Sequence, residues 1–206
     1  MRRVRADAVG ISEAATVVRD GGIVAIPTDT LYGLAADPFR AAAVARVFEA
    51  KGRPDDRPLP LVAADVTQVE TQLGRLTPTA RALANAFWPG PLTLLVDAPP
   101  SIADAVTAGT GRVGVRVPAH EVPQALCRTC GTLLTATSAN LAGQAATDDP
   151  EHVVRVLGDR VDLVLDGGTT PGGAPSTIVD VTSGVPRLVR PGAIDWEEVL
   201  ACVQRA

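Results

Sequence analysis

The stretch SEAATVVRDGGIVAIPTDTLYGL, residues 12–34, carries a helix signal and a strand signal in direct succession. Ser12 is a favourable N-cap, and the residues after it predict a helix to about Arg19, ended by the glycine pair that follows. The β-branched run at 22–26 predicts a short strand, which stops at Pro27 because proline has no N–H to donate to a sheet. A helix followed at once by a buried strand is typical of an α/β protein.

The same alternation continues along the chain, with no internal repeat and no change of composition that would mark a linker. The pairs Thr77–Pro78 and Asp149–Pro150 each place proline directly after an N-cap residue, which marks a helix start. Further helices are predicted over residues 41–50, 77–87, 121–129, 149–157 and 195–204. Further strands are predicted over residues 59–63, 92–96, 113–117, 132–136, 161–165, 177–181 and 186–190.

The last three predicted strands are separated by too few residues for helical crossovers, so part of the pairing there should be antiparallel. We therefore expect an α/β fold in a single domain spanning residues 1–206. Its one sheet should be twisted, with mixed parallel and antiparallel strands, and flanked by helices. A chain of 206 residues buries enough surface to fold without a disulfide or a structural metal.

Composition bounds the function. No apolar run approaches the ~18 residues of a membrane span, and the arginines of residues 1–5 are followed by Asp7, Ser12 and Glu13 rather than by the apolar core of a signal peptide. These features predict a cytoplasmic protein without a membrane partner. The net charge is −4 and aromatic residues make up only 3%. Strong direct nucleic-acid binding is therefore not expected, because it usually needs a basic excess or rings on which bases stack.

Cys127 and Cys130 form a C-x-x-C motif near the end of a predicted helix. A zinc site would need two more ligands at similar spacing, and only Cys202, His120 and His152 remain. We predict buried or half-buried thiols and no metal site, with redox or metal chemistry as the alternative.

The chain contains eighteen arginines and one lysine, Lys51, which lies two residues before Arg53. Lysine is a compact charge where arginine is a wide planar fork, so a tight phosphate site can demand lysine. A glycine-hinged helix end that carries both cations points several donors at one place. The alternative is a solvated helix terminus, where cations interact favourably with the helix dipole.

Three more segments place polar groups where strands end. In PTDTLYGL, residues 27–34, two threonines and an aspartate can surround a small polar ligand, or can stabilise a turn by their own hydrogen bonds. In RVGVRVP, residues 112–118, the two arginines project from one face of a strand. A buried Arg116 requires an anionic ligand or an internal ion pair. TATSANLAG, residues 135–143, leaves a strand through Ser138 and Asn140, either as part of a ligand site or as an ordinary turn.

The glycine-rich segment GGTTPGGAPS, residues 167–176, is the most flexible-looking part of the chain. It is not a Walker loop, because no lysine follows its glycines.

In these motifs the chain resembles the YrdC-type threonylcarbamoyl-adenylate synthases, over about residues 10–195. The signature K-x-R followed by S-x-N is matched by Lys51, Arg53, Ser138 and Asn140. Further matches, in the same order, are PTDTLYGL, FWPGPLT (87–93), the RVP segment at Arg116, PSTIVD (175–180) and the RPG segment at Arg190. The resemblance is to the short form, which lacks an additional C-terminal domain.

The resemblance implies a role for each matched residue. ATP would be bound by Lys51, Arg53, Ser138, Asn140 and Arg190, with Lys51 and Arg53 as the catalytic pair. Threonine would be bound by Thr30, Arg116 and Ser176. The chain departs from the family pattern at Val62, where relatives often have histidine, at Arg112, where threonine is frequent, and at Ala146, where serine is common.

The reaction implied joins L-threonine, bicarbonate or CO2, and ATP to form threonylcarbamoyl-AMP and pyrophosphate. ATP would be a substrate, with Mg2+ carried on its phosphates. The product would pass to the machinery that attaches the threonylcarbamoyl group to adenosine 37 of tRNA. Three other functions remain open: a carbamoyl transferase that uses a carbamoyl-adenylate, a catalytically idle nucleotide-binding paralogue, and an RNA-binding module.

Overall fold

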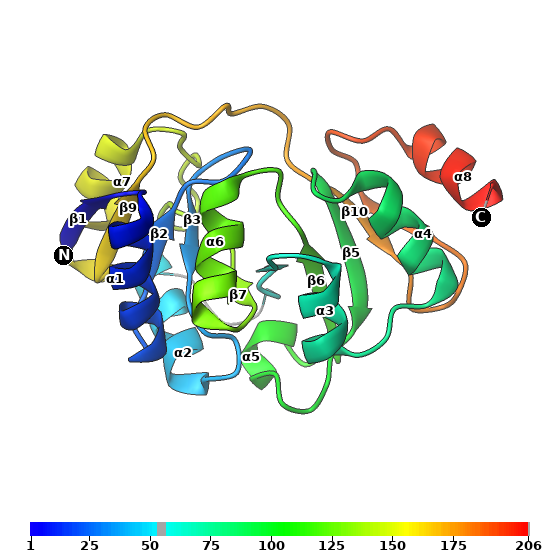
Figure 1. The fold of residues 1–206 in the computed structure, drawn as a ribbon, viewed down its shortest axis with the longest axis horizontal. Helices are drawn as coiled ribbons and strands as arrows, with labels where there is room; N and C mark the ends of the chain where they lie inside the picture. Colours follow the sequence, from blue (N-terminus) through cyan, green and yellow to red (C-terminus); the bar gives the residue numbers. More distant parts are fainter. Residues whose placement is uncertain (53–56, 206) are drawn as a thin grey trace.

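The computed structural model describes residues 1–52 and 57–205, and their strands form two sheets (Figure 1). The five-stranded sheet has the order β1 (Arg2–Arg5), β9 (Leu163–Asp166), β2 (Val24–Ile26), β3 (Gly33–Ala35), β8 (Thr137–Ser138). The six-stranded sheet has the order β11 (Arg187–Arg190), β10 (Thr177–Asp180), β5 (Leu92–Asp97), β6 (Arg112–Arg116), β4 (Leu61–Val62), β7 (Leu134–Thr135). In Figure 1 the five-stranded sheet lies on the left with the N-terminus and the six-stranded sheet on the right.

Both sheets mix parallel and antiparallel pairs, which confirms the predicted mixed α/β class. In the five-stranded sheet β9 is parallel to β1 and β2, whereas β3 is antiparallel to β2 and β8. In the six-stranded sheet β5 is parallel to β10 and antiparallel to β6, and β4 is parallel to β6 and antiparallel to β7. The antiparallel pairing expected near the C-terminus is that of β10 with β11.

The expectation of one sheet was wrong, and the segment predicted as a strand over 132–136 shows why. Its residues form β7 at the edge of the six-stranded sheet, and two residues further on the chain pairs again as β8 in the five-stranded sheet. One extended segment thus pairs with both sheets. Adjacency along the chain does not reveal this, because strand pairing is decided by distant partners.

The helices cover the outer faces of the sheets (Figure 1). Figure 1 shows α1 beside α6 at the front and α4 beside α8 at the right, near the C-terminus, and both pairs are in contact. The described helices are α1 (Ala8–Arg19), α2 (Ala41–Lys51), α3 (Val66–Leu73), α4 (Pro78–Phe87), α5 (Asp104–Thr107), α6 (Glu121–Cys130), α7 (Pro150–Leu157), the 3-10 turn Gly158–Arg160, and α8 (Trp196–Gln204). Among the described residues no helix is both long and apolar enough to cross a membrane.

Helix starts follow the capping rules, with one correction. Thr77 accepts a hydrogen bond from the backbone N–H of Ala80 (3.2 Å) and caps α4, as predicted, and Asp149 caps α7. The prediction of Ser12 as the cap of the first helix was wrong. That helix begins at Ala8, where Asp7 accepts from two backbone N–H groups at 3.1 and 3.0 Å. An acidic cap earlier in the chain left Ser12 inside the helix.

The two sheets share one core. A single cluster of fully buried side chains contains Ala25 of β2, Leu34 of β3, Leu94 of β5 and Val115 of β6. The chain passes from β9 to β10 through residues 167–176, which we call the crossover loop and which runs along the top of Figure 1. Residues of both sheets and of the crossover loop line one cavity, which is the candidate site.

Candidate active site

A cavity of about 500 Å³ opens between the two sheets. The five-stranded sheet and the turn that follows β2 contribute Thr28, Thr30, Leu31, Tyr32, Gly33, Thr137 and Ser138. The six-stranded sheet and the segments beside it contribute Arg57, Pro58, Pro60, Leu61, Val62, Thr93, Leu95, Gly114, Arg116, Ala136, Pro175, Ser176, Ile178, Val189 and Arg190. The wall is thus largely apolar, with hydroxyl and guanidinium groups at a few points, as in many small-molecule sites.

The structure brings together most of the residues singled out in the sequence. Thr30, Arg116, Ser138, Ser176 and Arg190 all line the cavity. Lys51 and Asn140 contact Ser138 from outside the cavity wall. Arg53 lies outside the described residues.

Gly114 lines the cavity, and its lack of a side chain leaves space free there. A Cβ added there would lie 3.1 Å from Cγ2 of Thr93 on the neighbouring strand β5. A side chain at this position would therefore crowd Thr93 at the cavity wall.

Arg116, the last residue of β6, forms an internal ion pair. Its Nη1 donates to Oδ1 of Asp29 at 2.6 Å, and the two side chains are only 11% and 10% exposed. The second carboxylate oxygen of Asp29 accepts from the backbone N–H of Ala119 at 3.0 Å. The guanidinium makes no other hydrogen bond to the part of the chain that the structure describes. Arg116 is therefore ion-paired with Asp29 and still has N–H groups that could donate to a ligand in the cavity.

A second guanidinium approaches the same cavity from β11. Nη2 of Arg190 donates to the carbonyl oxygen of Ser176 (2.7 Å) and to its Oγ (3.3 Å), and this hydroxyl lies 2.8 Å from Oγ1 of Thr93. Desolvation and the positive charge of Arg116 lower the pKa of Arg190 below its usual value. An anion bound near Arg190 would offset these unfavourable effects on its charge.

Thr30 lies in a turn held by its own hydrogen bonds, as one interpretation of PTDTLYGL predicted. Its Oγ1 is 3.2 Å from Oγ1 of Thr28, and its carbonyl oxygen accepts from Oγ1 of Thr170 and from the N–H of Gly172, both at 2.8 Å. The turn also lines the cavity. The turn interpretation is therefore confirmed, the ligand interpretation stays a prediction, and the turn is tied to the crossover loop.

Lys51 is buried, with only 3% of its surface exposed, which excludes the solvated helix terminus. Its Nζ donates to the carbonyl oxygen of Ser138, to that of Asn140 (3.0 Å) and to Oδ1 of Asn140 (3.2 Å). Oγ of Ser138 also donates to Oδ1 of Asn140. The end of α2 is thereby joined to the turn that follows β8, although the two lie far apart in the sequence.

Tyr32, the only tyrosine of the chain, has a structural role that the sequence analysis missed. It is fully buried, and its hydroxyl donates to the carbonyl oxygen of Gly168 (2.8 Å) and accepts from the N–H of Gly167 (3.2 Å). Desolvation raises its pKa to about 12. Tyr32 thus anchors the start of the crossover loop. Because Tyr32 lies within the PTDTLYGL motif, the sequence could have indicated that it has a role near the site.

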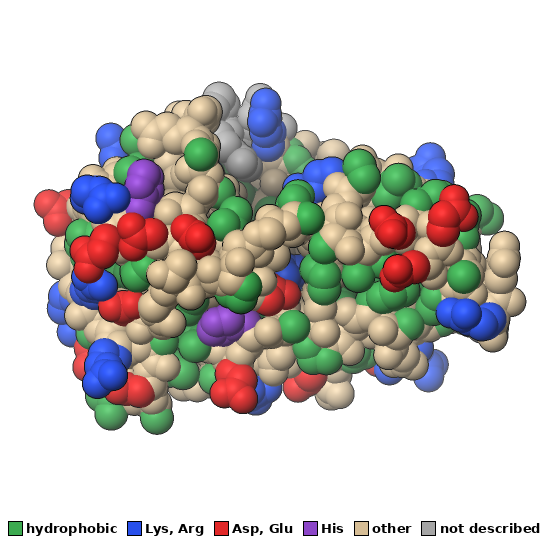
Figure 2. Space-filling view, turned by 90° about the horizontal axis from the view of Figure 1, so that it is seen from above, with side chains coloured by type: hydrophobic (Ala, Val, Ile, Leu, Met, Phe, Trp, Pro, Cys, Tyr) green, Lys and Arg blue, Asp and Glu red, His purple; other side chains and the backbone are tan. Residues whose placement is uncertain are grey.

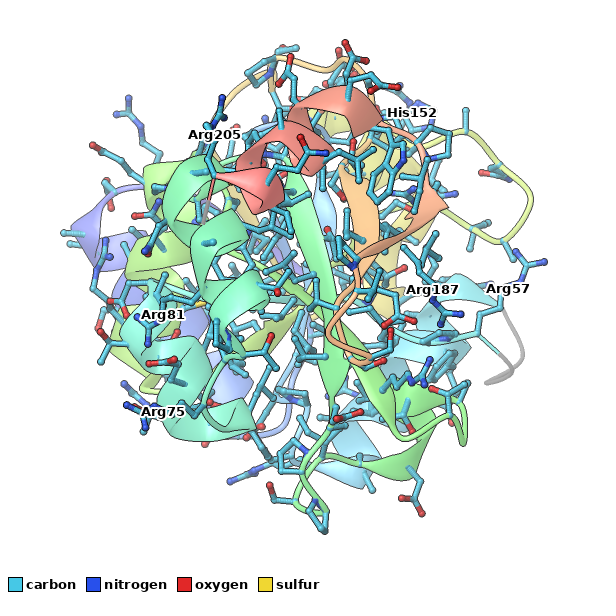
Figure 3. All side chains as sticks on the ribbon, turned by 90° about the vertical axis from the view of Figure 1, so that its right-hand side faces the viewer. Arg57, Arg75, Arg81, His152, Arg187 and Arg205 are labelled. Carbon is cyan, nitrogen blue, oxygen red and sulfur yellow. The ribbon has the colours of Figure 1, made fainter. Side chains whose placement is uncertain are left out.

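Arg57 is a second residue that the sequence analysis did not single out as a site residue. It lines the cavity although its side chain is exposed. In Figure 3 it extends outward on the right, on the same side of the view as Arg187 and away from Arg75 and Arg81.

The three departures from the family pattern have different environments. Val62 is buried in the cavity wall. Its side chain is apolar and cannot form the hydrogen bonds that a histidine at this position could form. Ala146 is half-buried in the segment before α7. Arg112 is not part of the cavity wall and donates to Oδ2 of Asp180 at 3.2 Å.

Asp180 of β10 holds two arginines and is itself buried. Burial opposes its ionisation, but hydrogen bonds from Thr182 and Arg187, with the charge of Arg112, outweigh this and lower its pKa to about 2. In an unfolded chain the pKa of an aspartate is about 3.9. The ionised carboxylate therefore stabilises the fold above about pH 4, and this contribution is lost as the pH falls toward 2.

We expect Asp180→Asn to lower the free energy of unfolding by about 1–2 kcal/mol at pH 7, less than the full shift implies because both arginines are partly exposed. Urea denaturation of the parental protein and the variant should give a difference that shrinks between pH 4 and pH 2. Asp159→Asn is the control, since the Asp159 side chain is fully exposed. A difference that stays constant over this range would assign the effect to packing instead of charge.

The cysteines are free thiols, as expected. Cys127 is buried and donates to the carbonyl oxygen of Val62 (3.5 Å), and Cys130 is half-buried at the end of α6. Burial raises the pKa of Cys127 strongly and that of Cys130 to about 11, so both are protonated near neutral pH. Within residues 1–52 and 57–205 no group of three or more histidine, cysteine or acidic side chains is arranged to hold a metal ion.

The fold and the cavity define an α/β protein with a small-molecule site between two mixed sheets. Comparison with known proteins identifies a family with this fold. The model of the Sua5/YciO/YrdC family, described as "Telomere recombination", matches residues 16–192, and the chain belongs to this family.

A threonylcarbamoyl-AMP synthase from Bacillus subtilis is 40% identical over 194 residues, which are 94% of this chain and 56% of the relative. A putative threonylcarbamoyl-AMP synthase from Mycobacterium tuberculosis is 38% identical over 92% of this chain and 87% of its own length. The crystal structure of Pyrococcus abyssi Sua5 complexed with L-threonine superposes with a TM-score of 0.90 at 38% identity, covering 98% of this chain and 59% of that one. The chain thus spans little more than half the length of the Bacillus and Pyrococcus proteins.

Proposed function

We propose that this protein synthesises threonylcarbamoyl-AMP from L-threonine, bicarbonate or CO2, and ATP, with release of pyrophosphate. One observation carries the proposal: a single cavity between the sheets joins the guanidinium groups of Arg116 and Arg190 to the S-x-N turn that Lys51 holds. The names of the relatives and the L-threonine bound in the Pyrococcus structure support the same function.

The two anionic substrates have separate partners in this proposal. The carboxylate of threonine is bound by Arg116, with the hydroxyls of Thr30 and Ser176 beside it. ATP is bound by Arg190, Ser138, Asn140, Lys51 and Arg53. Charge-assisted hydrogen bonds from guanidinium and ammonium groups are the contacts that carboxylates and phosphates prefer. Lys51 and Arg53 act as the catalytic pair by stabilising charge on the phosphates.

Mg2+ would enter on the phosphates of ATP. Its ligands would be phosphate oxygens and water. The ion would neutralise phosphate charge, while the side chains named above hold the substrates.

The chemistry needs no protein nucleophile. The amine of threonine attacks the carbon of CO2, or of bicarbonate with loss of water, and forms a carbamate. A carbamate oxygen then attacks the α-phosphorus of ATP, the new O–P bond forms, and the bond to pyrophosphate breaks. The protein contributes by holding the reacting groups in contact and by stabilising charge on the phosphates, and both effects lower the barrier.

The product is a mixed anhydride that can donate its threonylcarbamoyl group. In the proposed function it passes to the machinery that modifies adenosine 37 of tRNA, which implies a cytoplasmic location. Figure 2 looks down on the face crossed by the crossover loop and shows acidic and basic side chains of the described residues intermixed there.

We expect pyrophosphate release to require threonine and bicarbonate together. The test incubates the protein with ATP, bicarbonate and each amino acid in turn, measuring pyrophosphate and the mass of the adenylate. Equal turnover with carbamoyl phosphate and no threonine would favour a carbamoyl transferase. Nucleotide binding without any pyrophosphate would favour an idle paralogue, and a salt-dependent gel shift with RNA would favour an RNA-binding module.

A further inference from the structure

Asp29 connects the two sheets at the cavity wall. It lies in the turn after β2 of the five-stranded sheet. Of its two donors, Arg116 ends β6 of the six-stranded sheet and Ala119 lies in the segment that follows β6. Each carboxylate oxygen accepts one of these hydrogen bonds, at 2.6 and 3.0 Å. The carboxylate is therefore held at both ends, and it holds one edge of the guanidinium in turn.

This contact restrains the Arg116 guanidinium at one of its nitrogens. An arginine side chain otherwise has several rotatable bonds, and ordering it on ligand binding costs conformational entropy. Because Asp29 restrains Nη1, the guanidinium samples fewer orientations, and its remaining N–H groups lie at a cavity that Arg116 lines. A guanidinium oriented in advance loses less freedom when it receives a planar anion such as a carboxylate.

The same contact gives the two arginines of the cavity different net charges in their surroundings. Arg116 and Asp29 together form a neutral pair, whereas Arg190 donates to the uncharged hydroxyl and carbonyl oxygen of Ser176. A phosphate chain carries several charges and is attracted more strongly to the uncompensated cation, while a carboxylate carries only one. The charge of Asp29 should therefore keep phosphates away from Arg116.

We propose that Asp29 is a positioning residue that orients Arg116 for the carboxylate of the amino-acid substrate and keeps phosphate groups out of that position. The proposal rests on the proposed function for the identity of the substrates. It assigns Asp29 no contact with the reacting atoms.

The test compares Asp29→Asn with the matched control Asp162→Asn. Asp162 also accepts from one arginine, Arg46 (2.9 Å), and from one backbone N–H, that of Ile23 (2.7 Å), but it is not part of the cavity wall. Asparagine retains an oxygen for the backbone N–H in both variants, and thermal melting verifies folding. The steady-state KM values for threonine and ATP are then measured with pyrophosphate as inhibitor.

We expect Asp29→Asn to raise the KM for threonine about tenfold, while kcat and the KM for ATP change less than threefold. Pyrophosphate should become an inhibitor that competes with threonine in this variant alone. Asp29→Glu, which keeps the charge, should recover part of the threonine KM and remove the competition. Asp162→Asn should leave the ratio of the two KM values unchanged.

Equal rises of both KM values, or an unchanged threonine KM, would overturn the proposal. Calorimetric titration of L-threonine separates this result from a failure of the proposed function. If the parental protein releases no pyrophosphate but binds threonine more tightly than Asp29→Asn does, the proposed function is wrong and the role of Asp29 stands. If the parental protein does not bind threonine, both are wrong.

Discussion

Replacing Lys51 with arginine should reduce the rate of pyrophosphate release at least tenfold, and Lys51→Ala should reduce it about 100- to 1,000-fold, the usual cost of removing one preorganised donor at developing charge. The ammonium of Lys51 fits among three oxygens of Ser138 and Asn140. A guanidinium is wider and planar, so it cannot take this place without moving the turn.

Two explanations of such a loss must be separated, because Lys51 also holds the S-x-N turn. If Lys51 acts on the phosphates, Lys51→Met should weaken binding of ATP much more than binding of adenosine, since only ATP carries the phosphates. If Lys51 only holds the turn, both affinities should fall together. Calorimetric titration of the two ligands, with thermal melting as a check on folding, distinguishes these outcomes.

Arg128→Ala is the control for the helix-end contribution. Arg128 is an exposed cation in the last turn of α6, as Lys51 is a buried one in the last turn of α2. Its removal should leave turnover unchanged. A Lys51→Arg variant with parental turnover would show that the compact shape of the lysine ammonium is not required, contrary to the phosphate hypothesis.

The sequence predicts the helices better than it predicts the sheets, for a physical reason. The starts of α4 and α7 are determined by a cap and a proline that are adjacent in the chain, so both could be predicted. The division into two sheets depends on partners far away, and β7 and β8 pair with different sheets although they are almost contiguous. Strands β1 and β3 and helices α3 and α5 were missed because their signals are short.

The candidate site shows the same limit. The spaced motifs predicted that Lys51 lies near Ser138 and Asn140, and the structure places them in contact. The acceptors are mostly backbone carbonyl oxygens, which residue identity does not reveal. Because burying an unpaired charge is costly, the sequence predicted an anion beside Arg116. A carboxylate of the chain and a carboxylate of a ligand would satisfy this requirement equally. Only the fold identifies Asp29 as the internal one.

Arg116→Ala should raise the KM for threonine about 10- to 150-fold, which corresponds to about 1.5–3 kcal/mol for a lost hydrogen bond to a charged group. The KM for ATP should change much less, because Arg190 and the S-x-N turn remain. The same variant should also be less stable, by about 3 kcal/mol, since it leaves the buried carboxylate of Asp29 without its cation. A tenfold loss of ATP affinity with unchanged threonine affinity would contradict the role proposed for Arg116.

The double variant Arg116→Ala/Asp29→Asn separates the two effects. Removing the charge of Asp29 removes the unpaired carboxylate, while the asparagine oxygen can still accept from Ala119. Thermal and urea denaturation should therefore show much of the lost stability restored, whereas the threonine KM should stay as high as in Arg116→Ala. If threonine use recovered together with stability, Arg116 would serve only as the structural partner of Asp29, because a guanidinium that binds the substrate carboxylate cannot be replaced by repairing the fold.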